Sequence, residues 1–477
     1  MSNSVSTHSD RDRAGRAAGE RPLLLCLSQS FTPDTTPTGI RAGKLLESLS
    51  ARYDITVLTE AEGASSNGGV HVEVVRSRRP VRLFALLRRL RLNKLLELFV
   101  WPDESIFWLL PALRAGRRIV RERRPRAIVV FMMPYSAGLA GMALARSSGL
   151  PLVLNLDDSP TCTDMHPYFP TRLHHRLARA LEDLYVRRAD AIVYVSQTNL
   201  ELVRSRQPRA LRDRFHLVRY GADPEDFRPL PPRSDSFEIA YVGAMSGWWA
   251  LIGEREPGGG LRGAYAAWNR LGRHEVTTLE DRTSSPAVIG RAILAAIARH
   301  PDWEGRVRLT LYGNPYPAEV VQRALGSAGV ESVVSFHDPV PHDEATQILC
   351  ASDLLFITLP RRPDGSRGGR ISAKTYEYLM TDRPILAAVS EGENRDYLLD
   401  KPGVWLADPA DDERMREVIE GLVEAKFAGR ASAFERESLR AELSYATRAE
   451  QFAAAVEAAV ARRGGLAPAQ EPNSSPR

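Results

Sequence analysis

At 477 residues the chain is too long for a single hydrophobic core, so two domains are expected. A hydrophobic content of 43% and a charged content of 26% are those of an ordinary soluble globular protein, and no apolar run approaches the roughly 20 residues needed to cross a bilayer. The net charge of +5 is too small to indicate nucleic acid as a partner, and the three scattered cysteines argue against a disulfide framework and favour the cytoplasm.

The amino-terminal half alternates strand-like and helix-like segments after a polar lead-in. Residues 1–20 lack the apolar core of a signal peptide and are expected to be a disordered tail. The strand-like segments are nearly continuous apolar runs, which is typical of parallel strands covered by helices on both faces. They are residues 23–29, 54–59, 70–75, 127–133, 152–158 and 191–196. The pattern predicts an α/β domain, doubly wound and Rossmann-like, over residues 21–230.

Two stretches near the start of this domain are candidates for binding. Thr38, Gly39 and Arg41 open the first predicted helix, and Arg41 is a candidate contact for a phosphate or an acceptor. Residues 76–94 hold eight Arg or Lys and no acid, interleaved with apolar residues, as is typical of contact with an anionic membrane surface. A solvated basic helix is an equal alternative, because a projection at about 100° per residue does not gather the cations on one face.

Polar residues follow the fifth predicted strand. Asp157 and Asp158 lie at its carboxyl end, where open α/β sheets usually bind their ligands. We expect one carboxylate to orient an acceptor hydroxyl or a donor sugar, although Asp-Asp-Ser-Pro is also a strong turn string. His166 is a further candidate for the same cleft, with a structural role as its alternative.

A second alternating series follows a linker that is rich in proline and charge, residues 222–236. Its strand-like segments are residues 237–243, 308–314, 333–338, 354–359, 384–389 and 403–408. We predict a second Rossmann-like domain over residues 231–438 that faces the first across a cleft. Residues 246–285 interrupt it as an irregular insertion rich in glycine and tryptophan, whose role as a lid, an interaction surface or a loose segment stays open.

The stretch GGRISAKTYEYLMTDRPILAAV, residues 368–389, reads as a loop, a helix and a buried strand. A helix start exposes unpaired N–H groups, and here Arg370 and Lys374 add positive charge, so the stretch suits a diphosphate. Glu377 would repel phosphate but would accept hydrogen bonds from the paired hydroxyls of a ribose. The alternative is a surface helix in which Lys374 and Glu377 form an ordinary pair one turn apart.

The carboxyl-terminal region has a helical apolar stripe between residues 439 and 462. This helix needs an apolar partner elsewhere in the molecule. Residues 463–477 resemble the lead-in in composition and are expected to be a disordered tail.

Five ordered stretches resemble the GT-B glycosyltransferases of the family 4 type. The likeness covers residues 21–445 without the insertion. It is carried by SQSFTPDTTPTGIRAGKLLESL, by WPDESIFWLLPALRAG with AIVVFMMPYSAGLAGMALARSSGLPLVLNLDD, by RADAIVYVSQTNLELV with HLVRYGADPEDFRPLPP, by FEIAYVGAMSG, and by GVESVVSFHDPVPHDEATQILCASDLLFITLP with ISAKTYEYLMTDRPILAA. The resemblance implies a GT-B fold, in which the second domain holds a nucleotide sugar and the last helix crosses back onto the first domain.

The resemblance also implies roles for single residues. Glu377 matches the ribose-binding glutamate of the family, and Gly243 matches the glycine where the first strand of the donor domain turns toward the phosphates. Arg370 and Lys374 would lie near the diphosphate. The backbone that follows Gly369 would bind the donor with them, and its residues are Ile371 and Ser372.

The chain departs from the family pattern at two points. Many members carry a glutamate that touches the donor sugar eight positions before the ribose-binding one, and here that position is Gly369. Many also carry an Arg and a Lys shortly after the first donor-domain strand, whereas here the first cation is Arg255. Neutralisation of the leaving phosphate is therefore expected from Arg370, Lys374 and Arg367.

The sequence thus predicts a glycosyltransferase that moves a sugar from a nucleoside diphosphate sugar to a hydroxyl acceptor. The family implies retention of the anomeric configuration and no required metal or other cofactor, and we find no metal-binding Asp-x-Asp in the donor domain. The base, UDP or GDP, is undetermined. A lipid-linked acceptor, a role in cell-surface polysaccharide or glycolipid synthesis, and a place at the inner face of the membrane would fit the basic stretch. A GT-B-shaped epimerase or hydrolase of sugar nucleotides, and a degenerate partner-binding protein, stay open as alternatives.

Overall fold

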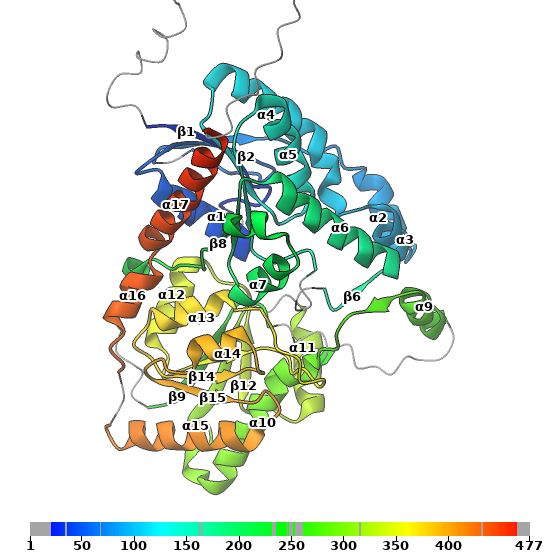
Figure 1. The fold of residues 1–477 in the computed structure, drawn as a ribbon. Helices are drawn as coiled ribbons and strands as arrows, with labels where there is room; N and C mark the ends of the chain where they lie inside the picture. Colours follow the sequence, from blue (N-terminus) through cyan, green and yellow to red (C-terminus); the bar gives the residue numbers. More distant parts are fainter. Residues whose placement is uncertain are drawn as a thin grey trace, which may run out of the picture.

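The computed structural model describes residues 21–33, 36–66, 68–161, 164, 166–230, 235–245, 247, 251–252, 261–313, 316–430 and 433–464. The two tails predicted at the ends therefore lie outside the described residues, apart from the last turn of the final helix. Two α/β domains stand one above the other, and the chain crosses back from the second to the first at its carboxyl end (Figure 1).

The amino-terminal domain is a parallel sheet of seven strands in the order β3-β2-β1-β4-β5-β7-β8. The strands are β1 (Leu23–Leu27), β2 (Asp54–Thr59), β3 (Val70–Val74), β4 (Ala127–Phe131), β5 (Leu152–Leu156), β7 (Ala191–Tyr194) and β8 (Phe215–Leu217). The helices are α1 (Pro37–Leu49), α2 (Val81–Arg89), α3 (Asn93–Phe99), α4 (Leu109–Arg123), α5 (Ser136–Ser148), α6 (Arg172–Arg188) and α7 (Gln197–Ser205).

Helices on both faces explain the continuous apolar runs of these strands. Alternate residues of β1 point to opposite sides of the sheet: Leu24 and Cys26 pack with α1, whereas Leu25 and Leu27 pack with α4 and α5. Each predicted strand of this domain is present, with ends within two residues of the prediction. The predicted doubly wound domain is confirmed.

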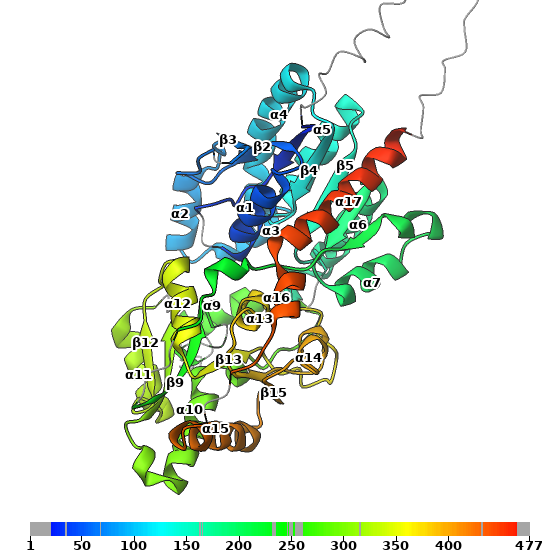
Figure 2. The same cartoon turned by 90° about the vertical axis from the view of Figure 1, so that its left-hand side faces the viewer.

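The carboxyl-terminal domain has a parallel sheet of six strands in the order β12-β11-β9-β13-β14-β15. The strands are β9 (Phe237–Val242), β11 (Val307–Tyr312), β12 (Val334–His337), β13 (Leu354–Thr358), β14 (Ile385–Ala388) and β15 (Val404–Ala407). The helices are α9 (Leu261–Arg270), α10 (Pro286–Arg299), α11 (Ala318–Ala328), α12 (His342–Ala351), α13 (Ala373–Leu379), α14 (Glu393–Leu398) and α15 (Asp412–Phe427). In both sheets the polar loops at the carboxyl ends of the strands meet at the boundary between the domains (Figure 2).

The carboxyl-terminal crossing is made of two helices, α16 (Glu437–Leu443) and α17 (Tyr445–Gly464). The prediction of one continuous helix over 439–462 is wrong at Ser444, where ψ is 145° and the hydroxyl accepts a hydrogen bond from the N–H of Thr447. The expected apolar partner is present: Phe452 and Val456 are buried against the amino-terminal sheet, and the ring of Phe452 stacks on Phe131 with 6.3 Å between centroids.

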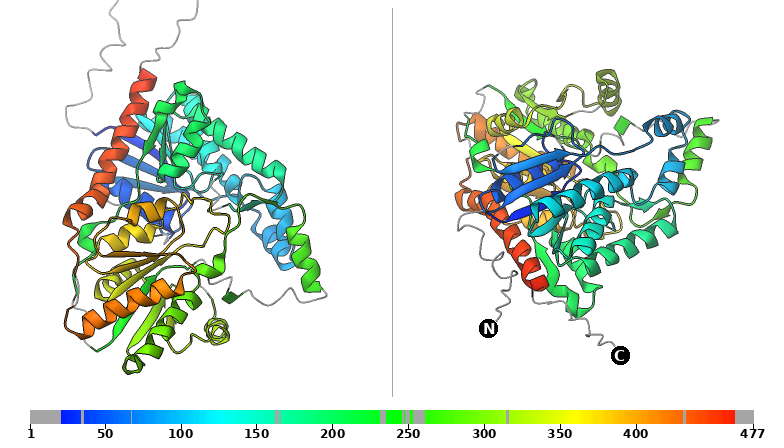
Figure 3. Two further views of the ribbon diagram at one scale, coloured as in Figure 1. Left: turned by 60° about the horizontal axis from the view of Figure 1, so that its bottom comes forward. Right: turned by 90° about the horizontal axis from the view of Figure 1, so that it is seen from above.

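The insertion at residues 246–285 reaches from the second domain to the first. Its helix α9 lies beside α2 and α3 in Figure 1 and in the tilted view of Figure 3. There Lys94 donates to the carbonyls of Trp268 and Leu271, which lie at the end of α9. Two short strands that the sequence did not reveal, β6 (Tyr168–Phe169) and β10 (His274–Glu275), pair antiparallel across the domain boundary. In its described part, the insertion is therefore a bridge between the domains.

Candidate functional site

The start of α13 brings together the residues predicted for the diphosphate. Gly243 ends β9 with φ +97°, a backbone conformation that favours glycine, and a Cβ there would lie 3.1 Å from Nζ of Lys374. Lys374 extends over the ring of Tyr241, with Nζ 5.0 Å from the ring centroid. The turn after the first strand of the second domain and the cation on α13 thus lie side by side.

Glu377 lies one turn further along α13, half-buried. Burial raises the pKa of its carboxyl, against the opposing effects of His342 and Lys374. His342 contacts Asp226 of the interdomain linker, with Nε2 3.5 Å from Oδ2, and these two residues line a cavity of about 390 Å³. The ribose-binding candidate therefore interacts electrostatically with two residues that line this cavity.

Arg41 and Asp157 form a buried ion pair, with 2.9 Å between Nη1 and Oδ1. Arg41 also donates to the carbonyl of Val218, and Asp157 accepts hydrogen bonds from Tyr220 and Asn155. The Arg41 side chain is 1% exposed, so the structure places it in the core rather than at the surface of the cleft. These contacts fix the conformation of the chain at the carboxyl end of β5.

Asp158, the next residue, is less buried than Asp157 and has a raised pKa. It is half-buried, and burial raises its pKa to about 6, with Arg370 acting in the opposite direction and Asp157 and Asp164 in the same direction. The influence of Arg370 places this carboxylate of the first domain near the predicted diphosphate cation of the second. Of the two predicted aspartates, Asp158 is the one that faces the domain boundary.

Gly369 lies against the first domain. A Cβ at this position would be 2.7 Å from Oδ1 of Asn199, near the start of α7, so any other residue here would force the Asn199 side chain to move. The N–H groups of Gly369 and Arg370 donate to Oδ2 of Asp164, at 2.8 and 3.1 Å. Arg362, which is buried, forms an ion pair with the same carboxylate. The backbone amides expected to face the donor are thus bound by an aspartate of the opposite domain.

The other residues predicted in this loop are Ser372, Ile371 and Arg367. Ser372 is the extended residue before α13, and its side chain makes no capping hydrogen bond. Ile371 is partly buried against the apolar core of the second domain. Arg367 points outward and pairs with Glu391 and Asp396 on the surface, so it is not placed to neutralise a phosphate in the cleft.

The acceptor-side candidates in the first domain lie apart from one another. Gly39 is buried in the first turn of α1, where its N–H donates to the hydroxyl of Thr36. His166 lies in a row of rings, with Nε2 3.1 Å from the hydroxyl of Tyr135, and burial lowers its pKa. It lines a cavity of about 150 Å³ together with Trp101 and Phe169.

Glu393, which the sequence reasoning missed, ties the second domain to the first. Its carboxylate accepts hydrogen bonds from the Ser196 hydroxyl, from the N–H groups of Gln197 and Thr198, and from Arg219. Burial acts to raise its pKa, but these donors outweigh burial, and the pKa lies below its ordinary value. Three of these four donors lie at the start of α7, so a carboxylate of one domain caps a helix of the other. The only hint of this role in the sequence is that Glu393 follows Gly392. Gly-Glu pairs are common, so this hint does not distinguish Glu393 from other surface glutamates.

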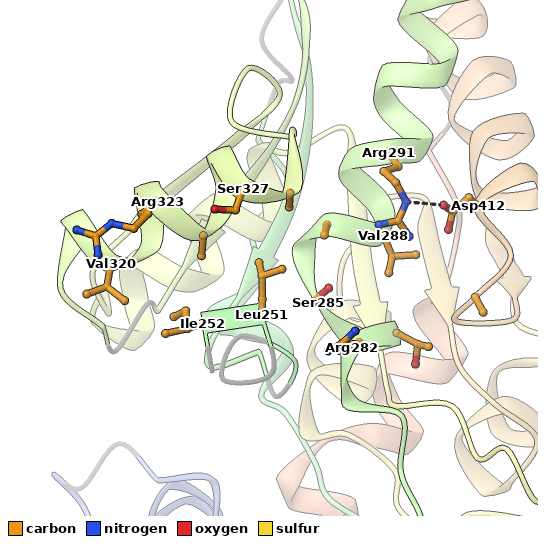
Figure 4. Close-up of a pocket in the computed structure, with 15 residues that line it drawn as sticks. Leu251, Ile252, Arg282, Ser285, Val288, Arg291, Val320, Arg323, Ser327 and Asp412 are labelled. Atoms are coloured by element: carbon orange, nitrogen blue, oxygen red, sulfur yellow. Dashed lines mark hydrogen bonds and ion pairs between the residues drawn. The ribbon is translucent and has the colours of Figure 1, made fainter. Parts of the chain in front are cut away.

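Another cavity, of about 840 Å³, lies elsewhere, between α10, α11 and the start of α15 (Figure 4). Arg291 points across one wall to Asp412 at 2.9 Å, while Arg323 lies on the opposite side. None of the residues predicted from the sequence lines it. This cavity is therefore separate from the residues that the sequence predicted for the site.

Comparisons with known proteins bear on the first domain and on the overall fold. Residues 38–221 match the family model "Glycosyl transferase 4-like domain". A search of curated proteins found no relative. Among solved structures, the chain is similar to Anabaena Alr3699/HepE in complex with UDP-glucose, with 14% identity and a TM-score of 0.60 over 92% of this chain and 100% of that one.

Two further structures share the architecture. Sucrose-phosphate synthase from Thermosynechococcus elongatus has 13% identity and a TM-score of 0.57, over 94% of this chain and 98% of that one. The α,α-trehalose 6-phosphate synthase from Burkholderia multivorans has 13% identity and a TM-score of 0.55, over 93% and 99%. At this level of identity the likeness concerns the fold.

Proposed function

We propose that this chain, a glycosyltransferase of the GT-B type, moves a sugar from a nucleoside diphosphate sugar to a hydroxyl acceptor. The family match of its first domain and the fold of the whole chain confirm the resemblance noted in the sequence. The nature of the donor, the acceptor and the stereochemistry are the parts that we propose.

One observation carries the donor assignment: Gly243, Lys374 and Glu377 converge at the carboxyl end of the second sheet. A diphosphate there would meet the ammonium group of Lys374 beside a glycine that lets it approach the backbone. Glu377, one turn further, would accept hydrogen bonds from the ribose hydroxyls. Arg370 supplies the second cation, on the side that faces Asp158.

Catalysis in such a site would be positional and electrostatic. As the bond between the sugar and the diphosphate breaks, negative charge grows on the leaving oxygen, and Lys374 and Arg370 stabilise it. Asp158 would accept a hydrogen bond from the acceptor hydroxyl and orient it toward the anomeric carbon. We propose retention of configuration and independence of a metal ion on the strength of the family resemblance.

The base and sugar are open to a direct test. A thermal-shift panel of UDP, GDP and ADP with their glucose, galactose and mannose conjugates would identify the donor, and UDP-glucose is the first probe because HepE was solved with it. Binding raises the melting temperature by mass action. If no member of the panel stabilises the protein, the proposal fails, and the degenerate partner-binding alternative takes its place.

Mass analysis of the products separates transfer from the enzymatic alternatives. Incubation with the donor alone would release free sugar from a hydrolase and an isomeric nucleotide sugar from an epimerase. A transferase would instead form a conjugate only when the acceptor is added. The anomeric proton coupling of that conjugate reports retention or inversion, and activity in excess EDTA tests the independence of metal.

A lipid-linked acceptor is supported by the surface around α2. The exposed side chains Leu83 and Leu86 of α2, and Leu90 directly after it, recur at helical spacing and form an apolar stripe. Basic residues of the 76–94 stretch flank the stripe. We propose that this face contacts an anionic bilayer, with exposed leucines entering the interface and arginines meeting the headgroups.

Among the described residues no helix is both long and apolar enough to span a bilayer, so this contact would be peripheral. Flotation with vesicles of neutral lipid and of neutral lipid mixed with phosphatidylglycerol tests it. We expect recovery with the anionic vesicles and its loss in a Leu83→Ser, Leu86→Ser double variant. Equal recovery with both vesicle types would refute the charge-dependent contact.

A further inference from the structure

The cavity of about 840 Å³ in the second domain separates two helices that cover the sheet, α10 and α11 (Figure 4). Helices on one face of a sheet usually pack against each other. Here one whole face of α11 lines the cavity instead, with residues at the spacing of successive helical turns: Val320, Arg323, Ala324, Ser327 and Ala328. The volume lies within the range of about 300–1,000 Å³ that is typical of small-molecule sites.

One wall of this cavity is aliphatic. Leu251 and Ile252 of the insertion lie between the two helices and pack against the apolar core of the second domain (Figure 4). Val288 of α10 and Val320 of α11 add to this wall. None of the lining residues, all of which belong to the described part of the chain, is aromatic. The wall therefore suits an alkyl chain rather than a ring that stacks on an aromatic side chain.

The polar residues around the cavity are mainly basic. Arg282, Arg291 and Arg323 line it, against a single acid, Asp412, which pairs with Arg291 at 2.9 Å. Arg323 is exposed and forms no ion pair with any residue that the structure describes. An anion in the cavity would therefore meet an excess of positive charge.

The start of α10 adds a hydrogen-bond donor. Ser285, the residue before the helix, is 3% exposed and lines the cavity, and its hydroxyl does not cap α10. That hydroxyl has no hydrogen-bond partner among the described residues. Buried polar side chains in native proteins are nearly always hydrogen-bonded, so this hydroxyl indicates a ligand group that the chain does not supply. It lies at a helix amino terminus, where the partial positive charge favours an anion.

We infer that this cavity binds an aliphatic anion, an alkyl chain that ends in a phosphate or a carboxylate. The chain packs along Leu251 and Ile252. The head lies at the start of α10, where Ser285 donates to one of its oxygens and Arg282 supplies positive charge. The inference goes beyond the proposed function and does not depend on it, because no residue of the proposed donor site lines this cavity.

Isothermal titration calorimetry of the full chain with four probes tests the inference. Octyl phosphate and octanoate carry both an anionic head and an alkyl chain, whereas inorganic phosphate and octanol carry one part each. Ser285→Ala and Arg282→Gln alter the head site, and Ser327→Trp fills space in the cavity from an exposed position of α11. Arg299→Gln is the matched control, because Arg299 is a cation of α10 that does not line the cavity.

We expect octyl phosphate or octanoate to bind at one site, about a hundredfold more tightly than octanol or inorganic phosphate. Each head variant should weaken this binding about tenfold, the size of one hydrogen bond to a charged group. The Ser327→Trp variant should weaken it further, and the Arg299→Gln control should bind as the wild type does. The probe that binds more tightly identifies the head as a phosphate or a carboxylate.

Four results would overturn the inference. Failure of both chain-bearing anions to bind would do so directly. Octanol that binds as tightly as octyl phosphate would show that the charge is not recognised, and inorganic phosphate that does so would show that the aliphatic wall is not used. Binding that is unchanged in all three cavity variants would place the probes elsewhere, at the proposed diphosphate site or at the stripe of α2. Each result leaves the proposed function intact, because the nucleotide panel tests that function separately.

Discussion

Substitution of Glu393 by alanine is the sharpest test of how the two domains are held together. The carboxylate is buried and accepts four hydrogen bonds from the first domain. The donors are the Ser196 hydroxyl at 2.6 Å, the N–H groups of Gln197 and Thr198 at 2.8 Å each, and Nη1 of Arg219 at 2.5 Å. Removing Glu393 therefore leaves two helix amides without their acceptor and the partly buried guanidinium of Arg219 without its carboxylate partner.

The magnitude follows from this geometry. Hydrogen bonds to a charged group contribute about 1.5–3 kcal/mol each, but they are not additive when they share one carboxylate. Breaking a buried pair by removal of one partner costs about 3–5 kcal/mol, and we expect the Glu393→Ala variant to lose this amount of interdomain stability. A loss of about 3 kcal/mol corresponds to exchange roughly a hundredfold faster at the amides of Gln197 and Thr198.

Hydrogen exchange followed by mass spectrometry over residues 196–199, together with urea unfolding, measures both effects. Glu391→Ala is the control, because Glu391 is exposed and pairs with Arg367 and Arg395 on the surface. The reasoning is refuted if both variants lose the same stability, or if exchange at α7 is unchanged in the Glu393 variant. Since the folded-state pKa of Glu393 lies below its ordinary value, its contribution is complete above the ordinary range and is lost as pH falls through the folded pKa.

Three further predictions concern the site itself. Glu377→Ala should raise the KM of the donor about tenfold to a hundredfold, which corresponds to about 1.5–3 kcal/mol for ribose hydrogen bonds that share one carboxylate and are not additive, and near-normal steady-state kinetics would remove the ribose assignment. If the ionised Asp158 orients the acceptor, kcat/KM should fall as pH falls through about 6, and the Asp158→Asn variant should be slower and lack this step in its pH profile. Arg41→Met should destabilise the first domain by about 3–5 kcal/mol in urea unfolding, because it leaves the buried Asp157 without its cation; a loss below about 1 kcal/mol would show that Tyr220 and Asn155 suffice.

Gly369, which departs from the family pattern, reads differently in the sequence and in the structure. Read alone, a glycine in place of a glutamate removes a contact to the donor sugar. In the folded chain a Cβ there would meet the Asn199 side chain, so the close approach of α7 favours glycine. A carboxylate is still present beside this loop, but it comes from Asp164, 205 positions earlier.

The alternation of apolar runs and amphipathic segments determined the two sheets, the linker and the helical stripe at the carboxyl end. These features depend on local periodicity and on burial of both faces, which the order of residues records directly. The expectation that Gly243, Lys374 and Glu377 share one site came from the family resemblance, and the structure places Gly243 beside Lys374.

Only the tertiary structure decided which segments that are distant in the sequence contact one another. Arg41 is a phosphate candidate by position in the chain, yet its partner Asp157 lies 116 residues away and draws it into the core. From the sequence, Glu393 and Asp164 look like ordinary surface acids. In the folded chain each carboxylate accepts hydrogen bonds from two backbone N–H groups of the other domain. Pairing of this kind depends on which loops the two sheets bring to one boundary, and no local pattern in the sequence carries that information.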